Sequence, residues 1–193
     1  INKTMTEHLK KTVKKCSALA ELKANDPVLD IASNDGTLLN FYKKKTVTVG
    51  VDPLVNKYKS YYKKISYKIS NFFQISDIKK LNLKKKFKII SALSVFYDLK
   101  DPNIFIKGIK ECLDENGIFV LEHSDLFSII KNNLFDTICH EHLEYYSSKV
   151  IIDMMNFNGL KVFDHEFNNI NGGSSRYYIC HHKAKYKTKK KKI

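Results

Sequence analysis

The sequence is poor in the residues that build disulfide frameworks, zinc knuckles and arginine-rich surfaces. Among its 193 residues it has four cysteines, no tryptophan and one arginine, Arg176. No two cysteines form a C-x-x-C pair, which argues against a zinc knuckle and a disulfide framework and favours a reducing cytoplasm. These cysteines are Cys16, Cys112, Cys139 and Cys180.

Long apolar runs are also missing. No stretch approaches the length that crosses a bilayer, and the start shows no signal-peptide pattern, so we expect no membrane partner. Hydrophobic residues make up 43% and charged residues 28% of the chain, a balance typical of one globular domain. The first residue is Ile1 rather than methionine, and we therefore treat the chain as a candidate piece of a longer polypeptide.

The formal net charge of +14 raises the hypothesis of a nucleic-acid-binding protein. However, nearly all of this charge is lysine, whereas bidentate contacts to guanine and phosphate usually come from arginine. A bias toward A/T-rich codons would explain the abundance of lysine, isoleucine, asparagine, tyrosine and phenylalanine together. We expect solvated lysine faces and no specific nucleic-acid partner, and we keep nucleic-acid binding as the alternative from a different class.

Strand and helix patterns alternate along the chain. We expect strands at 28–31, 47–51, 66–69, 87–93, 118–122, 161–167 and 176–181. We expect helices at 4–22, 37–44, 59–64, 101–113 (closed by Asn116-Gly117), 125–131 and 150–158. This order predicts an α/β fold with a Rossmann-like open, mostly parallel seven-stranded sheet, helices on both faces and an antiparallel last strand. The predicted domain is 1–183, followed by a frayed basic tail at 184–193.

A strand, a tight polar turn and a helix are predicted in succession around residues 28–44. The turn Ser33-Asn34-Asp35-Gly36 presents backbone N–H groups and short polar side chains, and it lacks the G-x-G-x-x-G pattern of dinucleotide folds. Asp52 ends the second strand, where a carboxylate can accept both hydroxyls of a ribose. The simpler interpretation is that Asp52-Pro53 is only a turn.

These residues support a family resemblance. The segment 28–39, VLDIASNDGTLL, resembles the first motif of class I S-adenosylmethionine (SAM)-dependent methyltransferases, and it looks most like the sugar-nucleotide C-methyltransferases. The resemblance continues at 51–53 and 94–98. It is most specific at 139–147, CHEHLEYYS, and at 171–174, NGGS. It spans about 5–178, nearly the whole chain.

The resemblance implies SAM as cofactor, with Asp52 at the ribose, Phe72 near the adenine and the turn around the methionyl part. The implied cofactor-binding residues are Asp30, Ser33, Asn34, Gly36, Asp52, Phe72 and Ser94. Ala32 stands where the family usually has glycine, so the turn must accommodate a Cβ atom. Family members usually also carry an N-terminal zinc-binding segment and a further C-terminal domain, which this sequence does not contain, so whether the piece holds a sugar nucleotide alone stays open.

The cluster His140-Glu141-His142 has two chemical interpretations. The first interpretation is a metal site, but these residues and the histidines at 123, 181 and 182 lack H-E-x-x-H spacing, and we expect no metal site. As acid–base groups, they suit methylation of a carbon, which needs a base to remove a proton beside a carbonyl group. The resemblance places the catalytic pair at His142 and Glu141, with Glu141 orienting His142 or acting as the base.

Further contacts to the substrate are predicted around this pair. Cys139 replaces a tyrosine that is frequent in the family, so Tyr97 is either a substitute hydrogen-bond donor or an aromatic wall of the pocket. The loop Asn171-Gly172-Gly173 is either a hairpin turn or a substrate-binding loop beside Arg176, which we place near the phosphates. The predicted substrate-binding residues are His140, Asn171, Gly172, Gly173 and Arg176.

The predicted activity is methyl transfer from SAM to the carbon next to a ketone, with a nucleotide-linked 4-keto-6-deoxy sugar methylated at C3 as substrate. An alternative within enzymes is O- or N-methylation of another small molecule. A fragment that binds SAM but is silent without further domains is a third hypothesis.

Overall fold

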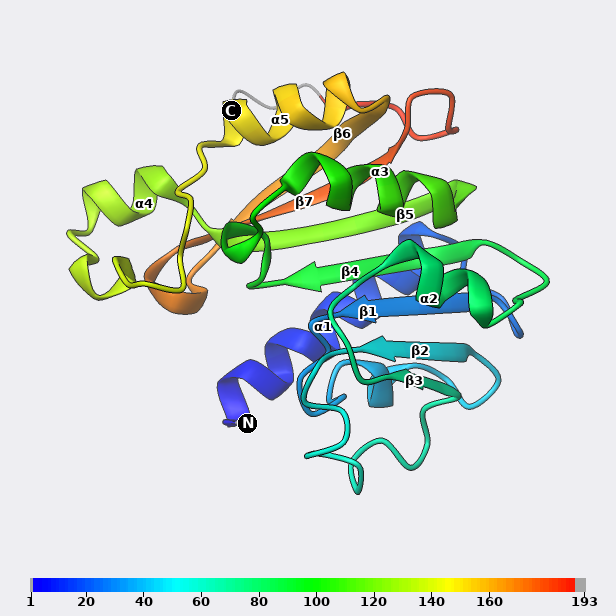
Figure 1. Ribbon diagram of the computed structural model, residues 1–193. Helices are drawn as coiled ribbons and strands as arrows, with labels where there is room; N and C mark the ends of the chain where they lie inside the picture. The colour runs from blue at the N-terminus through cyan, green and yellow to red at the C-terminus, as the bar shows by residue number, and fades with distance from the viewer. Residues whose placement is uncertain (1, 190–193) are drawn as a thin grey trace.

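A seven-stranded sheet forms the centre of the computed structural model, which describes residues 2–189. Its strands are β1 (Pro27–Ile31), β2 (Val47–Val51), β3 (Tyr67–Ile69), β4 (Phe87–Leu93), β5 (Leu113–Ser124), β6 (Leu160–Asn168) and β7 (Ser174–His181). The order across the sheet is β3-β2-β1-β4-β5-β7-β6 (Figure 1). The pairs among β1 to β5 are parallel, and β7 lies antiparallel to both of its neighbours. The predicted fold, including the antiparallel last strand, is confirmed.

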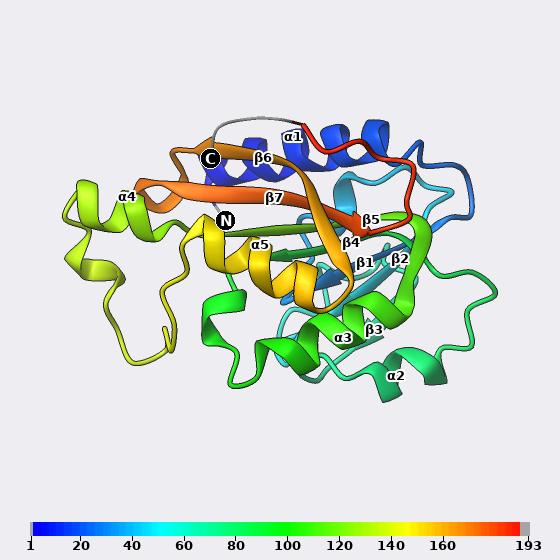
Figure 2. The same ribbon diagram turned by 90° about the horizontal axis from the view of Figure 1, so that it is seen from above.

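Helices cover both faces of this sheet. The α-helices are α1 (Lys3–Leu19), α2 (Ile75–Lys80), α3 (Pro102–Cys112), α4 (Leu126–Lys131) and α5 (Ser148–Phe157). Short 3-10 turns are η1 (Leu39–Phe41), η2 (Phe96–Asp98), η3 (Phe135–Thr137) and η4 (Ile170–Gly172). Helices α3 and α5 pack on one face and α1 packs on the other, as Figure 2 shows, so the sheet carries a core on each side.

Local sequence explains where these helices begin. The side chain of Asn2 accepts a hydrogen bond from the amide of Met5 at the start of α1, and Asp101 caps α3 by accepting from Ile104. Helix α3 also has Pro102 in its first turn, where the missing N–H group costs nothing. The strands β1 and β4 are apolar on both faces because helices or loops cover both sides of the sheet there.

Two predicted helices are wrong. Residues 37–44 form only the short turn η1, and residues 59–64 form consecutive turns without a helix. In the second segment, the buried hydroxyl of Tyr62 donates to the carbonyl of Asn34 at 2.8 Å and lies 2.7 Å from the Ser33 hydroxyl. These tertiary bonds hold the segment against the turn after β1, and they outweigh its weak helical propensity.

Two other sequence expectations also change. Asn116 and Gly117 lie within β5, at a bulge where the register with β4 shifts, instead of closing the preceding helix. Part of the predicted basic tail is packed: Ala184 is buried, and the ring of Tyr186 stacks on Phe163 at 4.6 Å. The tail residues 190–193 lie outside the described residues.

Arg176 is buried in an ion-pair network beneath α1, and it is not exposed beside a substrate loop. It stands opposite Glu122 of β5 and Glu166 of β6 in the antiparallel register. Its Nε atom donates to Glu122 at 2.6 Å and its Nη1 atom to Glu166 at 3.0 Å. His8 of α1 also contacts Glu122, at 2.7 Å, which ties the helix to the sheet. The prediction that Arg176 contacts phosphates is therefore not supported, because two carboxylates already neutralise its guanidinium.

Within residues 2–189, no helix combines the length and the apolar character that crossing a membrane requires.

Replacing Arg176 by leucine should strongly destabilise the fold, because the buried Glu122 would lose its cationic partner. Removal of one member of a buried ion pair typically costs about 3–5 kcal/mol. We expect a loss of this size in the free energy of unfolding, measured by urea denaturation. The matched control, Lys149→Leu, removes an exposed pair with Asp153 and should cost less than about 1 kcal/mol. Equal, small losses in both variants would contradict the role of the network.

Candidate active site at the carboxyl edge of the sheet

The turns that follow β1 and β4 contain strained backbone. Ala32 (φ 57°) and Asn34 (φ 49°) follow β1, and Ser94 (φ 56°) follows β4. Residues other than glycine rarely adopt this left-handed region, at a cost of roughly 1–2 kcal/mol each. The arrows of β1, β2 and β4 point to one edge in Figure 1, so the strained turns lie on the same side of the sheet. Such strain is common at binding sites, where the chain must present its backbone to a ligand.

Asp52 connects the turn after β1 to the end of β2. Its Oδ2 atom accepts the backbone N–H of Asn34 at 3.0 Å, and its Oδ1 atom accepts that of Leu54 at 2.7 Å. The side chain is buried, so these bonds fix a carboxylate at the carboxyl edge. Each carboxylate oxygen keeps further acceptor capacity for a ligand hydroxyl. This position fits the predicted contact with a ribose.

Asp30, near the end of β1, is buried beside Ser91, whose hydroxyl donates to Oδ1 of Asp30 at 2.6 Å. Burial raises the pKa of Asp30 to about 7; the bond from Ser91 lowers it, and repulsion from Asp52 and Asp35 raises it further. Three carboxyl groups thus interact electrostatically at this edge. A ligand with positive charge, such as the sulfonium and ammonium groups of SAM, fits this site.

The turn itself is tightly packed. Gly36 has φ 74°, and a Cβ atom there would lie 2.7 Å from the side chain of Ile65. Ser33 is engaged by the hydroxyl of Tyr62, as described above. Tyr62 was missed as a site residue from the sequence, where its only signal was its place in a basic aromatic segment.

Phe72, predicted near the adenine, follows β3 and is exposed.

Tyr97 and His142 meet across the site although 45 positions separate them. Their ring centroids lie 4.2 Å apart. The amides of Leu143 and Glu144 both donate to the carbonyl of Tyr97, at 2.9 and 3.2 Å. Burial raises the pKa of the Tyr97 hydroxyl, and the nearby side chain of Ser94, the strained residue after β4, lowers it. The predicted donor and the predicted base are therefore brought together beside the cofactor edge.

The hydrogen bond of the His142 ring fixes its tautomer. Its Nδ1 atom lies 2.7 Å from the carbonyl oxygen of Thr137. Because a carbonyl oxygen only accepts, Nδ1 must carry the proton, which leaves the lone pair of the neutral ring on Nε2. His142 is half-buried. The carbonyl of Thr137, which no side-chain motif could have revealed, performs the orienting role that we predicted for Glu141.

Glu141 and His140 are exposed. Interactions of the Glu141 carboxylate with its own backbone amide and with Cys139 lower its pKa. His142, in contrast, is half-buried and its ring is oriented by the carbonyl of Thr137, so the geometry favours His142 as the base of the predicted pair. The thiol of Cys139 is exposed beside both residues.

The loop 171–173 packs against the segment that follows β5. A Cβ atom on Gly172 would lie 2.7 Å from Leu134, and one on Gly173 would lie 2.6 Å from Ser128. The side-chain amide of Asn132 donates to the carbonyl of Gly172 at 3.1 Å. The two glycines therefore permit close approach of the loop to α4, and Asn171 is left exposed (φ 52°).

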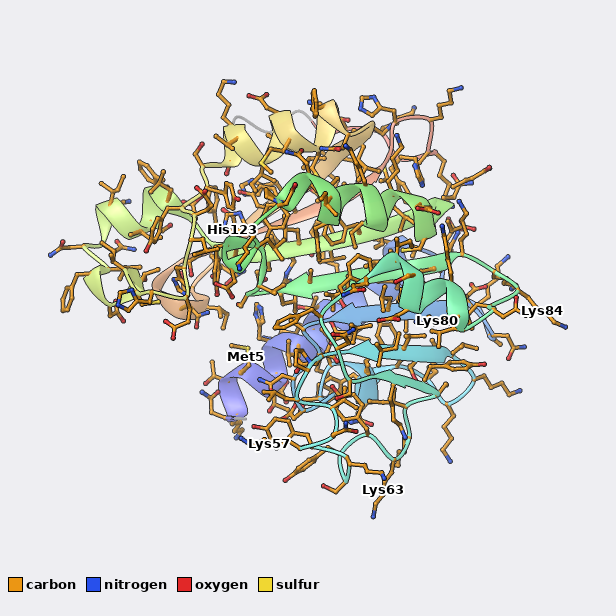
Figure 3. All side chains as sticks on the ribbon, viewed as in Figure 1. Met5, Lys57, Lys63, Lys80, Lys84 and His123 are labelled. Atoms are coloured by element: carbon orange, nitrogen blue, oxygen red, sulfur yellow. The ribbon has the colours of Figure 1, made fainter. Side chains whose placement is uncertain are left out.

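The remaining histidines do not assemble with His142 into a metal site. Among residues 2–189, no group of three or more potential ligands is arranged to hold a metal ion. His123 (labelled in Figure 3) is buried at the end of β5, where its Nδ1 atom lies 2.7 Å from the carbonyl of Ser124 and its ring stacks on Tyr177. The Nε2 atom of His181 lies 3.1 Å from the carbonyl of Leu113.

Comparison with protein families identifies the class of this protein. A model of the methyltransferase domain matches residues 1–165. The match covers most of the chain, which therefore belongs to this methyltransferase family. The membership confirms the methyltransferase class and the SAM cofactor that the sequence predicts.

Individual relatives are more distant. The chain is 27% identical over 173 residues to the C-methyltransferase NovU of Streptomyces niveus; this region is 89% of the chain but only 41% of NovU. A solved SAM-dependent methyltransferase from Clostridium acetobutylicum superposes with a TM-score of 0.69 at 14% identity, covering 91% of this chain and 92% of that one. The N-methyltransferase NodS from Bradyrhizobium japonicum gives a TM-score of 0.62 at 10% identity, covering 93% and 98%. Both of these solved structures share the fold of this chain.

Asp52→Ala should abolish SAM binding that calorimetry can measure. The variant removes the acceptor of two ribose hydroxyl bonds, each worth roughly 1.5–3 kcal/mol because the acceptor is charged. Asp153→Ala, on the exposed face of α5, is the matched control and should bind like the wild type. Thermal unfolding of both variants checks that the fold is retained. Wild-type affinity in folded Asp52→Ala would contradict the assignment.

The affinity for SAM should rise with pH through the titration of Asp30. Below its pKa of about 7 the side chain is protonated, so a cationic ligand must displace this proton when it binds. We expect the dissociation constant to fall, by up to about tenfold per pH unit, between pH 5.5 and 7. Asp30→Asn should bind weakly and lose this slope. A wild-type affinity that is flat over this range would exclude Asp30 from the SAM site.

Proposed function

We propose that this domain transfers the methyl group of SAM to a carbon next to a ketone, with a nucleotide-linked 4-keto-6-deoxy sugar methylated at C3 as substrate. The observation that carries the proposal is the pair of His142 and Tyr97 beside the SAM edge. A carbon acid needs both a base for its proton and a partner for the enolate oxygen. Methyl transfer to oxygen or nitrogen has less need of such a pair.

His142 is the proposed base. Its Nδ1–H group is bound to the carbonyl of Thr137 at 2.7 Å, which holds the ring in one orientation and leaves Nε2 free to accept a proton. When Nε2 takes the proton from the carbon next to the ketone, both ring nitrogens carry hydrogen. The bond to Thr137 persists in this state, because the carbonyl accepts from either form.

Tyr97 is the proposed donor to the enolate oxygen. Burial raises the pKa of its hydroxyl above the ordinary tyrosine value, although the nearby side chain of Ser94 lowers it. Tyr97 therefore stays protonated at neutral pH and can donate a hydrogen bond. Its contact with the ring of His142 supports the proposal that donor and base act on adjacent atoms of one substrate. In this role Tyr97 substitutes for the tyrosine that is frequent in the family at the position where this sequence has Cys139.

SAM, when bound, supplies the electrophilic methyl group. Asp52 would hold the ribose and Phe72 would lie near the adenine. The methionyl part, with its positive charges, would lie along the turn after β1 and near Ser94. The residues proposed for the methionyl part are Asp30, Ser33, Asn34 and Gly36.

The sugar-nucleotide specificity rests on the family resemblance and on the relative named as a C-methyltransferase. We propose His140 and the loop 171–173 as substrate contacts, because both border the segment that carries His142. Arg176 is left out of this set, since it is ion-paired in the core. We further propose that the activity belongs to a longer polypeptide, because the matched region spans 41% of NovU. We also propose a cytoplasmic location without specific nucleic-acid or membrane partners, because the cysteines form no C-x-x-C pair, the positive charge is nearly all lysine and no apolar run is long enough to cross a bilayer.

His142→Asn should lose both proton exchange and methyl transfer. With a non-reactive SAM analogue bound, the wild type should catalyse deuterium uptake at C3 of a 4-keto sugar nucleotide, because proton removal precedes alkylation. Loss of a general base typically costs about 10²–10⁴-fold in rate. We expect exchange, measured by NMR, and methylation, measured by mass spectrometry, to fall together by this factor.

Glu141→Gln is the matched control, with SAM affinity checked in both variants. It should keep most of the activity, because Glu141 does not orient His142 in this structure. Loss of exchange in Glu141→Gln with full activity in His142→Asn would reverse the two roles. Full activity in both variants would place the base elsewhere and remove the main support for C-methylation.

A further inference from the structure

A groove remote from the candidate active site lies between α1 and the segment 41–46. Its volume is about 820 Å³, and its two walls are residues 10–24 and residues 41–46. Residues 43–46 immediately precede β2, so this wall lies at the amino ends of the strands, opposite the carboxyl edge that holds Asp52 and His142. In Figure 2, α1 is the α-helix that runs along this face, and α2, α3 and α5 lie on the opposite face. The groove is therefore separate from the SAM site.

The floor of the groove is apolar. Val13 is buried against the sheet, and the side chains of Leu22, Phe41 and Tyr42 are half-buried. Ala18 is exposed on the α1 wall and leaves room beside them. Apolar surface of this kind gains free energy when a partner removes it from water, at about 25 cal/mol per Å².

The charged residues that line the groove are all lysines. Six lysines and no carboxylate line it. Eleven ion pairs occur among residues 2–189, and none of them involves a rim lysine. Two of the lysines come from α1, one from the end of the same wall and three from the opposite wall. They are Lys10, Lys14, Lys23, Lys43, Lys44 and Lys45.

Shape and charge together restrict the occupant. A nucleic acid would neutralise the lysines but would leave the apolar floor without a complement. A bilayer surface is too broad to enter a concave groove. A single phosphate or carboxylate would reach only part of the rim, because the lysines lie on both walls, within residues 10–23 and within residues 43–45. A helix with an apolar stripe between two acidic flanks matches the floor and both rims at once.

We propose that this groove binds an acidic amphipathic helix of a partner protein. The apolar stripe of that helix would lie on Val13, Leu22, Phe41 and Tyr42, and its carboxylates would pair with the lysines on the two walls. Like charges that lie close together repel one another, so pairing with the carboxylates of the partner adds to the gain from apolar burial.

The test uses a fluorescein-labelled helical peptide with leucines on one stripe and glutamates on both flanks, followed by fluorescence anisotropy in 0.15 M salt. The double variant Lys14→Glu/Lys44→Glu reverses one charge on each wall and should weaken binding at least about tenfold, since several exposed charge pairs are lost together. The matched control is Lys63→Glu/Lys84→Glu, which changes the net charge equally at exposed positions outside the groove (Figure 3). It should bind like the wild type.

A second variant separates shape from charge. Ala18→Trp fills the groove without changing its charge, and it should also weaken peptide binding. A peptide of the same composition with its leucines scattered around the helix should bind poorly to the wild type. All variants should keep their thermal stability and SAM affinity, because the groove lies away from the SAM site.

Equal binding of the peptide to the wild type and the groove variants would overturn the proposal. So would a DNA duplex or phosphatidylglycerol vesicles that bind more tightly than the peptide at this salt and lose binding in Lys14→Glu/Lys44→Glu.

Discussion

The buried carboxylate of Asp52 is the interaction on which the candidate site depends most. It accepts one amide from the turn after β1 and one from the segment after β2. These bonds hold Asn34 in its left-handed conformation and fix the two strand ends relative to each other. Tyr62 adds a second clamp on the same turn, through Ser33 and the carbonyl of Asn34. The strained backbone of Ala32 and Asn34 costs free energy, and the hydrogen bonds that this packing provides offset that cost.

The other half of the site depends on the long connection between β5 and α5. This connection leaves the sheet as α4, and it returns to place two amides on the carbonyl of Tyr97. Gly172 and Gly173 allow the loop before β7 to pack closely against it. His142 is therefore positioned by Tyr97, which follows β4, and by the carbonyl of Thr137 within the connection itself. The proposed cofactor site and the proposed base are thus held by separate parts of one sheet edge.

The sequence predicts the sheet well and the contacts between distant segments poorly. The strand 87–93 and the strand 47–51 have the predicted bounds because buried parallel strands are short apolar runs between polar turns. The segments 37–44 and 59–64 were mistaken for helices, because their pattern does not reveal that the Tyr62 hydroxyl bonds to the turn after β1. Local propensity cannot report a tertiary bond of this kind.

The site residues divide in the same way. Asp52 follows from a strand end, since the carboxyl ends of parallel strands share one edge. Asp30 and Ser94 were implied by the family resemblance. Arg176 was predicted near the phosphates of the substrate, because its partners Glu122 and Glu166 become visible only when the register of β5, β6 and β7 is known. The contact of Tyr97 with His142, and the anchoring of His142 by a backbone carbonyl, have no signature in a single sequence.

The most direct test of the account is the identity of the atom that receives the methyl group. The domain, or the longer protein that contains it, would be incubated with SAM labelled with ¹³C at the methyl group and with a 4-keto-6-deoxy sugar nucleotide. NMR separates a methyl group on carbon from one on oxygen or nitrogen by its chemical shift and its couplings. The account predicts a labelled methyl group bonded to C3. A labelled methyl group on oxygen or nitrogen would contradict it.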